Sequence, residues 1–205
     1  LLNAHYETEE NYVMAAAREL KKEYDYIHQR GYLLQIDAPD LALERQLYFQ
    51  KRPFEDFLEG VKRQVAAINH AVSDIPSERV RLHVCWGNYE GPHAGDVEVE
   101  EVLGLLYEAK VGALSIPFAN PRHQHGYRAF KKNPLPESMV LIPGVIDVTT
   151  NYLEHPEVVA NRICEAAEAV GDRSRVIAGT DCGFSTFTDY TMVAEDVCWA
   201  KFGSL

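Results

Sequence analysis

Helix and strand patterns alternate along most of this chain of 205 residues. Apolar residues recur at helical spacing in several stretches, which predicts helices over residues 11–30, 53–72, 96–106, 156–170 and 194–205. Short apolar runs between them predict strands at 32–37, 80–86, 113–118, 140–146 and 175–178. Strands that alternate with helices form βαβ units, so we expect an α/β fold with a parallel sheet.

Polar side chains follow almost every predicted strand. Because the carboxyl ends of parallel strands meet at one edge, these residues are expected to share one active-site mouth. They are Asp37, His83 with Cys85, Asn120, Asp147, and Asp181 with Cys182. An open doubly wound sheet would use the five strands as they stand, whereas a closed barrel needs eight. Periodicity alone leaves both architectures open.

Composition narrows the class of protein. A hydrophobic content of 46% supports one sizeable core, so we expect residues 1–205 to form a single domain. The net charge of −11, spread along the chain, argues against a nucleic-acid partner or an anionic membrane surface. Four cysteines do not make a disulfide framework, which favours a reducing cytoplasm. The chain begins without Met, which suggests a piece of a longer protein.

Metal-binding side chains lie two residues apart on one predicted strand. Alternation along a strand places His83 and Cys85 on the same face, and one imidazole with one thiolate makes half a zinc site. Cys182 follows another strand and is the third candidate ligand. A lone His-x-Cys is more often structural, with Cys acting as a small core residue. Zinc bonds of about 2.0–2.3 Å would require the three side chains to converge to within about 4 Å.

Five segments, in order and over nearly the full length, resemble the catalytic barrel of cobalamin-independent methionine synthase and its shorter single-barrel bacterial relatives. The resemblance implies a (β/α)8 TIM barrel of which this chain holds the C-terminal part, about five βα units, with the first strands missing. The matching segments are Gln-Ile-Asp-Ala-Pro-Asp-Leu-Ala at 35–42, His-Val-Cys-Trp-Gly-Asn-Tyr-Glu-Gly-Pro-His at 83–93, Ala-Asn-Pro-Arg-His at 119–123, Pro-Gly-Val-Ile-Asp at 143–147 with Glu-His-Pro at 154–156, and Ala-Gly-Thr-Asp-Cys-Gly-Phe at 178–184.

The same resemblance implies an enzyme, a zinc-dependent methyltransferase of methionine biosynthesis. In that family a zinc ion held by His, Cys, Cys and Glu activates the thiol of homocysteine, and 5-methyltetrahydrofolate supplies the methyl group. His83, Cys85 and Cys182 would be the zinc ligands. Asp37 would pair with the substrate ammonium, which gives it a substrate-binding and catalytic role.

Two further strand-end residues are assigned to the site. We expect Asn120 to bind substrate and Asp147 to serve in catalysis. Asp147 and Asp181 could instead orient His83 or a loop, and simple capping is a further alternative for both.

Two positions depart from the family pattern. Pro117 stands where relatives carry the zinc-ligating Glu, so the site would keep three protein ligands or recruit His123 or His125. Thr149 lies in a segment where the larger synthases have a His proposed to protonate the leaving folate amine. The alternatives are therefore alkylation of another thiol, such as coenzyme M, or a truncated barrel without catalysis. We expect thiol binding with weak turnover of the folate.

The remaining motifs predict structural roles. His123 and His125 are expected to be solvated or anion-contacting loop residues, and Cys164 and Cys198 to be packing residues within helices. The segment 154–156 is expected to start a helix. The partners implied are a small thiol and a methyl donor, and the sequence leaves a homo-oligomer open.

Overall fold

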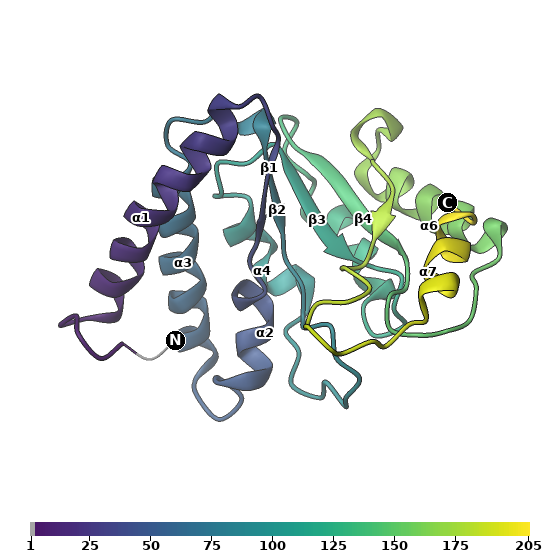
Figure 1. Cartoon of the computed structure of the whole chain (residues 1–205), viewed down its shortest axis with the longest axis horizontal. Coiled ribbons are helices and arrows are strands. Elements are labelled where there is room, and N and C mark those ends of the chain that lie inside the picture. Colours follow the sequence, from purple (N-terminus) through teal and green to yellow (C-terminus); the bar gives the residue numbers. More distant parts are fainter. Residues whose placement is uncertain (1–2) are drawn as a thin grey trace.

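The computed structural model describes residues 3–205 (Figure 1). Its strands are β1 Leu34–Asp37, β2 Val80–His83, β3 Ala113–Pro117, β4 Val140–Ile146 and β5 Gly179–Thr180. Its α-helices are α1 Glu9–Gln29, α2 Asp40–Leu47, α3 Phe54–Ala71, α4 Val99–Leu106, α5 Arg128–Lys132, α6 Pro156–Val170 and α7 Glu195–Phe202. Short 3-10 helices occupy Ser77–Arg79, Gln124–Tyr127 and Arg173–Arg175.

The five strands form one sheet in the order β1-β2-β3-β4-β5, and all neighbouring strands are parallel. The sheet curls into a half-barrel, with α1 and α3 packed side by side near β1 and with α6 and α7 beyond β4 (Figure 1). Strands that follow in sequence also lie next to each other in space, as in a (β/α)8 barrel. The expectation of a partial TIM barrel of five βα units is confirmed.

The helix-covered face of the sheet carries the core. Side chains alternate along each strand, and those pointing outward are fully buried, including Leu82, Leu114 and Leu141 at 0% exposure. They pack in one cluster with apolar residues of α3 such as Phe57 and Val61. Because one face of α3 is buried, its apolar residues recur at helical spacing, and this spacing predicts the helix from the sequence.

The opposite, concave face is open at both edges of the sheet. Gln35 and Asp37 of β1 are exposed, whereas their outward neighbours in the same strand are buried. Leu33 before β1 and Ile177 before β5 are 46% and 49% exposed, and alternation places both on the concave face. Residues 3–205 therefore leave apolar surface uncovered on the side that a complete barrel would enclose.

Several boundaries differ from the sequence-based predictions. α2 has no counterpart among the predicted helices, because a proline after an apolar run is also typical of a strand end, yet Pro39 precedes a helix whose Leu41 is fully buried. β2 ends at His83 rather than at residue 86. β5 begins at Gly179, after an isolated bridge between Val176 and Leu141, so the predicted strand at 175–178 was placed too early. α5 was also missed.

Other elements match closely. β4 and α6 have the predicted bounds, and α1, α3 and α4 lie within a few residues of theirs. His155 caps α6, since its Nδ1 accepts a hydrogen bond from the Glu157 backbone at 3.2 Å, which confirms a helix start at 154–156. Over the described residues, no helix is both long enough and apolar enough to cross a membrane.

Candidate metal centre

The three predicted ligand residues come together at the carboxyl edge of the sheet. Cys182 Sγ lies 3.4 Å from His83 Nε2. The ligand atoms of His83, Cys85 and Cys182 all lie within 4.8 Å of one another, slightly wider than the predicted 4 Å. His83 and Cys85 are buried, and Cys182 is partly exposed. Side chains almost 100 residues apart in sequence thus converge because β2 and β5 end at the same edge.

Strand register sets the orientation of His83. Asp37, His83 and Ser115 are partners across β1, β2 and β3 and so lie at one level of the sheet. Ser115 Oγ lies 3.3 Å from His83 Nδ1, and both groups are buried. A contact at Nδ1 leaves Nε2 facing Cys182, which is how ligand histidines are usually oriented.

The two sulfurs are held by loops that are joined to each other. Cys85 follows β2 directly and Cys182 follows β5. Asn88, in the loop after Cys85, donates a hydrogen bond to the Gly183 carbonyl at 2.8 Å. This contact links the two loops close to the cysteines, three residues after Cys85 and one after Cys182, so the spacing of the sulfurs does not depend on the strands alone.

The thiols are electrostatically unequal. The neighbouring Cys182 thiol, opposed by burial and aided by His83, lowers the pKa of Cys85. The proximity of Cys85, together with burial, raises the pKa of Cys182. Burial alone would lower the pKa of His83, but Cys85 and then Asp37 and Asp181 outweigh it and raise that pKa. The cluster therefore favours one thiolate that is stabilised by a neighbouring thiol proton and by the imidazole.

The donor set fits a zinc ion. Two sulfurs and one imidazole nitrogen are ligands that zinc prefers, and a small inward shift of the side chains from separations of up to 4.8 Å would give the spacing of a tetrahedral site. Across residues 3–205, the group whose ligand atoms lie this close together contains only these three residues. Pro117 ends β3 and lines the adjacent pocket, where it offers no metal-binding atom. Three protein ligands leave a position for a substrate, as in catalytic zinc sites.

Asp37 stands at the exposed rim of the cluster. Its carboxylate Oδ1 lies 4.0 Å from His83 Nε2, and its side chain is 71% exposed. No hydrogen bond from another side chain of residues 3–205 fixes this carboxylate. Asp37 is thus beside the metal ligands, as predicted, and free to meet a charged group.

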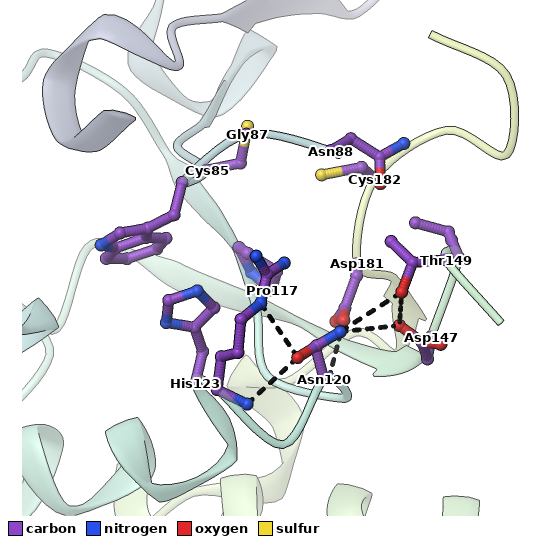
Figure 2. Close-up of a pocket in the computed structure, with 13 residues that line it drawn as sticks. Cys85, Gly87, Asn88, Pro117, Asn120, His123, Asp147, Thr149, Asp181 and Cys182 are labelled. Carbon is purple, nitrogen blue, oxygen red and sulfur yellow. Dashed lines mark hydrogen bonds between the residues drawn. The ribbon is translucent and has the colours of Figure 1, made fainter. Parts of the chain in front are cut away.

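A pocket extends from the cysteines towards the ends of β3 and β4 (Figure 2). Asn120 and Asp147 both line it and are joined by a hydrogen bond of 3.2 Å from Asn120 Nδ2 to Asp147 Oδ1. Thr149 donates to the same carboxylate oxygen at 2.9 Å, and Thr150 donates to Oδ2. Burial would raise the pKa of Asp147, but these hydrogen bonds outweigh it and lower that pKa.

Arg122 lines the same pocket and is oriented by Asn120. Its Nε and its backbone N–H both donate to Asn120 Oδ1, each at 3.1 Å. The Asn120 amide therefore connects two side chains, since it donates to Asp147 and accepts from Arg122. This chain of contacts fixes the direction of the guanidinium.

Asp181 holds the loop after β3. Its carboxylate accepts backbone hydrogen bonds from Phe118, Ala119 and Asn120 at 2.8 to 2.9 Å. A Cβ at Gly144 would lie only 2.0 Å from Asp181 Oδ1, so glycine is required there for the carboxylate to fit. Complete burial raises the pKa of Asp181 to about 7 despite the backbone amides. Of the roles left open for Asp181, the structure supports the orientation of a loop.

A buried ionic group supports the loop after β4. Glu154 accepts the Asp147 backbone N–H at 2.8 Å and pairs with Lys201 of α7 at 2.9 Å. The side chains of Lys201 and Glu154 are 0% and 2% exposed. Arg162 of α6 lies 3.7 Å from Glu154 and donates to the carbonyls of Val145 and Ala119. These contacts tie the ends of β3 and β4 to α6 and α7.

The other predicted candidates lie outside the three-ligand cluster, although His123 lines the pocket beside it (Figure 2). His123 is buried against Trp86, so of its two predicted roles the solvated one is wrong, and its Nε2 lies 3.3 Å from the Asp96 carboxylate. His125 is exposed and pairs with Glu98 at 2.8 Å. Within the described residues neither joins the metal-type group. Cys164 is exposed, contrary to the predicted packing role, and Cys198 is partly buried.

Ser115, Asn88 and Arg122 were missed as site residues. Ser115 is the polar residue of an otherwise apolar strand, and its register with His83 was the available signal. Arg122 belongs to a matching segment but was given no role. Its contact with Asn120 depends on the local turn and has no simple sequence signature.

Comparisons with known proteins show which family and which relatives this chain matches. A family described as "Cobalamin-independent synthase, Catalytic domain" matches residues 5–196. The 2-hydroxypropyl-CoM lyase of Xanthobacter autotrophicus is 27% identical, over 94% of this chain and 53% of its own length. The uncharacterized protein YxjH of Bacillus subtilis is 26% identical, over 96% of this chain and 53% of its own length.

A solved structure shows the same fold. The B12-independent methionine synthase from Shewanella sp. W3-18-1, determined in complex with selenomethionine, superposes with a TM-score of 0.69 at 19% identity. The match covers 98% of this chain and 54% of that protein. The chain therefore spans about half the length of the relatives that it matches.

Proposed function

The chain belongs to the catalytic-domain family of cobalamin-independent synthases, and from that premise we propose that it is a zinc-dependent enzyme that transfers an alkyl group to a thiol. The acceptor of first choice is homocysteine, and the group transferred is methyl, from 5-methyltetrahydrofolate or another donor. The convergence of His83, Cys85 and Cys182 within 4.8 Å is the observation that carries the proposal. Bound zinc would lower the pKa of a coordinated substrate thiol, so that a thiolate is available near neutral pH.

The surrounding residues are assigned to orientation and binding. Ser115 contacts Nδ1 of His83 and keeps Nε2 directed at the cysteines. Asp37, exposed beside His83, would pair with the ammonium of an amino-acid thiol and hold its sulfur near the three ligands. Asp147 has both carboxylate oxygens occupied by hydrogen bonds, so we assign it to positioning Asn120 rather than to proton transfer.

The reaction is a displacement at carbon. The substrate thiolate attacks the alkyl carbon, a carbon–sulfur bond forms, and the bond to the leaving group breaks with its electron pair on that group. A folate amine leaves poorly unless it takes up a proton. Thr149, in the segment where the larger synthases place a proton-donating His, donates its hydroxyl hydrogen to Asp147 and is engaged. These contacts favour weak turnover of a donor whose leaving group must be protonated.

A second candidate acceptor is a thiol such as coenzyme M. A relative at 27% identity carries the name 2-hydroxypropyl-CoM lyase, and Pro117 removes the ligand that the methionine synthases use. A site without an anionic fourth ligand is more positive, which favours binding of thiolates but makes them less nucleophilic. The two candidates share thiol activation and differ in the alkyl donor.

The test is thiol binding followed by turnover. Homocysteine and 2-mercaptoethanesulfonate are added in turn to zinc-loaded protein, and proton release is followed with an indicator dye. Turnover is then assayed. For homocysteine, the assay is methyl transfer from 5-methyltetrahydrofolate. For 2-mercaptoethanesulfonate, it is the reverse reaction, in which 2-hydroxypropyl-coenzyme M is cleaved and the thiol is released. We expect proton release with at least one thiol, and slow methionine formation.

Two variants test whether thiol binding depends on the candidate metal ligands. His83→Ala should abolish thiol-dependent proton release, whereas His125→Ala, which alters an exposed histidine paired with Glu98, should leave it unchanged. Absence of thiol binding by zinc-loaded wild-type protein would rule out the transferase. Fast methionine formation would show that Pro117 and Thr149 do not impair the reaction with the folate.

A further inference from the structure

Arg122 is a cation without an anionic partner in the wall of the pocket that contains the cysteines. It lines this pocket together with Cys85, Cys182 and Asn120. Among residues 3–205, no carboxylate oxygen lies within the 4.0 Å of Arg122 that would define an ion pair. In a chain with 31 acidic and 20 basic residues, an arginine at a pocket wall that has no carboxylate partner needs an explanation.

The guanidinium is held in a fixed direction. Its Nε donates to Asn120 Oδ1 at 3.1 Å, while its two terminal nitrogens donate to no residue of the described chain. Asn120 cannot rotate freely, because its Nδ2 donates to Asp147 and Thr149 at 3.2 and 3.3 Å. Since the Asn120 backbone is also fixed by Asp181, the cation has little conformational entropy left to lose when it binds a ligand.

The carboxylates in the pocket wall do not neutralise this cation. Asp147 uses its oxygens for Asn120, Thr149 and Thr150, and Asp181 uses its oxygens for three backbone amides. Both groups are therefore satisfied within the protein, with 1% and 3% exposure. The two free terminal nitrogens of Arg122 remain to form a forked pair of hydrogen bonds, a geometry that suits carboxylate, sulfonate and phosphate groups.

We infer that Arg122 is a specificity-determining residue that binds the acidic group of the substrate thiol, a carboxylate or a sulfonate, while the sulfur lies at His83, Cys85 and Cys182. The inference rests on the proposed function, because it takes the thiol as the occupant of this pocket. Its ligand class is a small thiol whose sulfur and acid group are separated by a few bonds. Asn120 and Asp147 then act through Arg122, as positioning residues.

Paired thiols test the inference on the complete zinc-loaded protein. The affinities of 2-mercaptoethanesulfonate and of its neutral counterpart 2-mercaptoethanol are measured by isothermal titration calorimetry with wild type, Arg122→Met and Arg122→Lys. Wild type should prefer the anionic thiol by about 10- to 100-fold, the usual worth of a charge-assisted hydrogen-bonded pair. Arg122→Met should remove this preference and leave the affinity for 2-mercaptoethanol within about 3-fold of wild type.

Arg122→Lys should retain part of the preference, because a lysine keeps the charge and loses the fork. The matched control is Arg128→Met, which changes an exposed arginine outside this pocket and should keep the full preference. Equal affinity of wild type for the two thiols, or an unchanged preference in Arg122→Met, would overturn the inference.

A ligand without sulfur separates this inference from the proposed function. Ethanesulfonate is titrated into the same proteins without any thiol, in zinc-loaded and in metal-free form. Saturable binding that is lost in Arg122→Met and kept in Arg128→Met supports the anion subsite, even where no thiol binds and the transferase proposal has failed. Two results together would overturn the inference. Ethanesulfonate would show no saturable binding that depends on Arg122, and wild type would show no preference for 2-mercaptoethanesulfonate over 2-mercaptoethanol.

Discussion

The two ends of the half-barrel build their parts of the site differently. At the ends of β3, β4 and β5, Asp181 accepts three backbone amides, and the Glu154 and Lys201 pair is buried behind Asp147. At the end of β1, Asp37 projects a carboxylate that is 71% exposed and that no side-chain hydrogen bond within residues 3–205 holds. One end is organised before any ligand arrives, and the other offers an exposed carboxylate whose nearest partner is His83 at 4.0 Å.

The difference shows where the site is self-sufficient. Buried polar groups are costly unless fully paired, so the network around β3 to β5 fixes one arrangement of Asn120, Arg122 and Cys182. Asp37 lies on the edge strand of the sheet, beside the open concave face, where a substrate or further protein could meet it. Stability should therefore depend on the first region, and ligand binding should depend on both.

The largest effect is expected from Lys201. Lys201→Met would leave Glu154 buried with Arg162, 3.7 Å away, as its remaining cationic partner, and loss of the direct pair should cost about 3 kcal/mol of unfolding free energy. Urea unfolding followed by circular dichroism measures the change. Lys132→Met, which breaks the exposed pair with Glu100, should cost less than about 1 kcal/mol. An equal loss of unfolding free energy in the two variants would contradict a stabilising role for the buried ion pair.

A double variant sharpens this result. In Glu154→Gln/Lys201→Met both charges of the direct pair are gone, Arg162 keeps its hydrogen bonds to two backbone carbonyls, and the Gln carbonyl can still accept the Asp147 amide. Because residue 154 no longer carries a buried charge that lacks Lys201, part of the stability lost in Lys201→Met should return. Additive losses from the two substitutions would show that the pair does not act as a unit.

Asp181→Asn should be the next most severe change. The amide offers one oxygen to three backbone donors and turns its own N–H groups towards the rest, so at least one buried N–H loses its partner. An unsatisfied buried donor costs about 1–3 kcal/mol. Thermal unfolding measures the effect, and a change of less than about 0.5 kcal/mol would show that the carboxylate does not hold this loop.

Asp147 should make stability depend on pH in one direction. Its pKa in the folded protein is lowered, so its contribution is present above the pKa of the unfolded chain and is lost as pH falls through the folded pKa. The difference in unfolding free energy between wild type and Asp147→Asn should therefore shrink below about pH 4. A difference that grows on acidification would contradict the assigned direction.

The smallest effect on stability is expected from Asp37→Asn, within about 0.5 kcal/mol, because the side chain is 71% exposed and its one ionic contact, with His83, is 4.0 Å long. Its effect on binding should be selective. Affinity for homocysteine should fall about 10-fold, while affinity for 2-mercaptoethanesulfonate, which has no ammonium, should not fall. A loss of stability as large as that of Asp181→Asn would remove the contrast between the two regions.

Local patterns were enough to predict much of this fold. α3 and α6 carry apolar stripes and clear helix ends, and β4 is an apolar run between a turn and a helix. His83, Cys85 and Cys182 could be predicted as neighbours because strand alternation and strand order place them at one edge. The half-barrel followed from family resemblance, since periodicity left an open sheet as an alternative.

The remaining features depend on tertiary contacts. α2 follows a proline that served equally well as a strand stop, and its helix is fixed by burial of Leu41. The role of Ser115 depends on the register of β3 against β2. The buried pair of Glu154 and Lys201 joins residues 47 apart in sequence, and no local pattern marks either as buried.

The metal content of the protein tests the central claim most directly. Wild type, Cys182→Ser and the control Cys198→Ser are dialysed against zinc, washed with a weak chelator and analysed for metal by plasma emission. We predict about one zinc per chain in wild type and in Cys198→Ser, and little in Cys182→Ser, because a thiolate ligand has been removed. Wild-type protein without retained zinc, or the same zinc content in all three proteins, would contradict a metal centre at His83, Cys85 and Cys182.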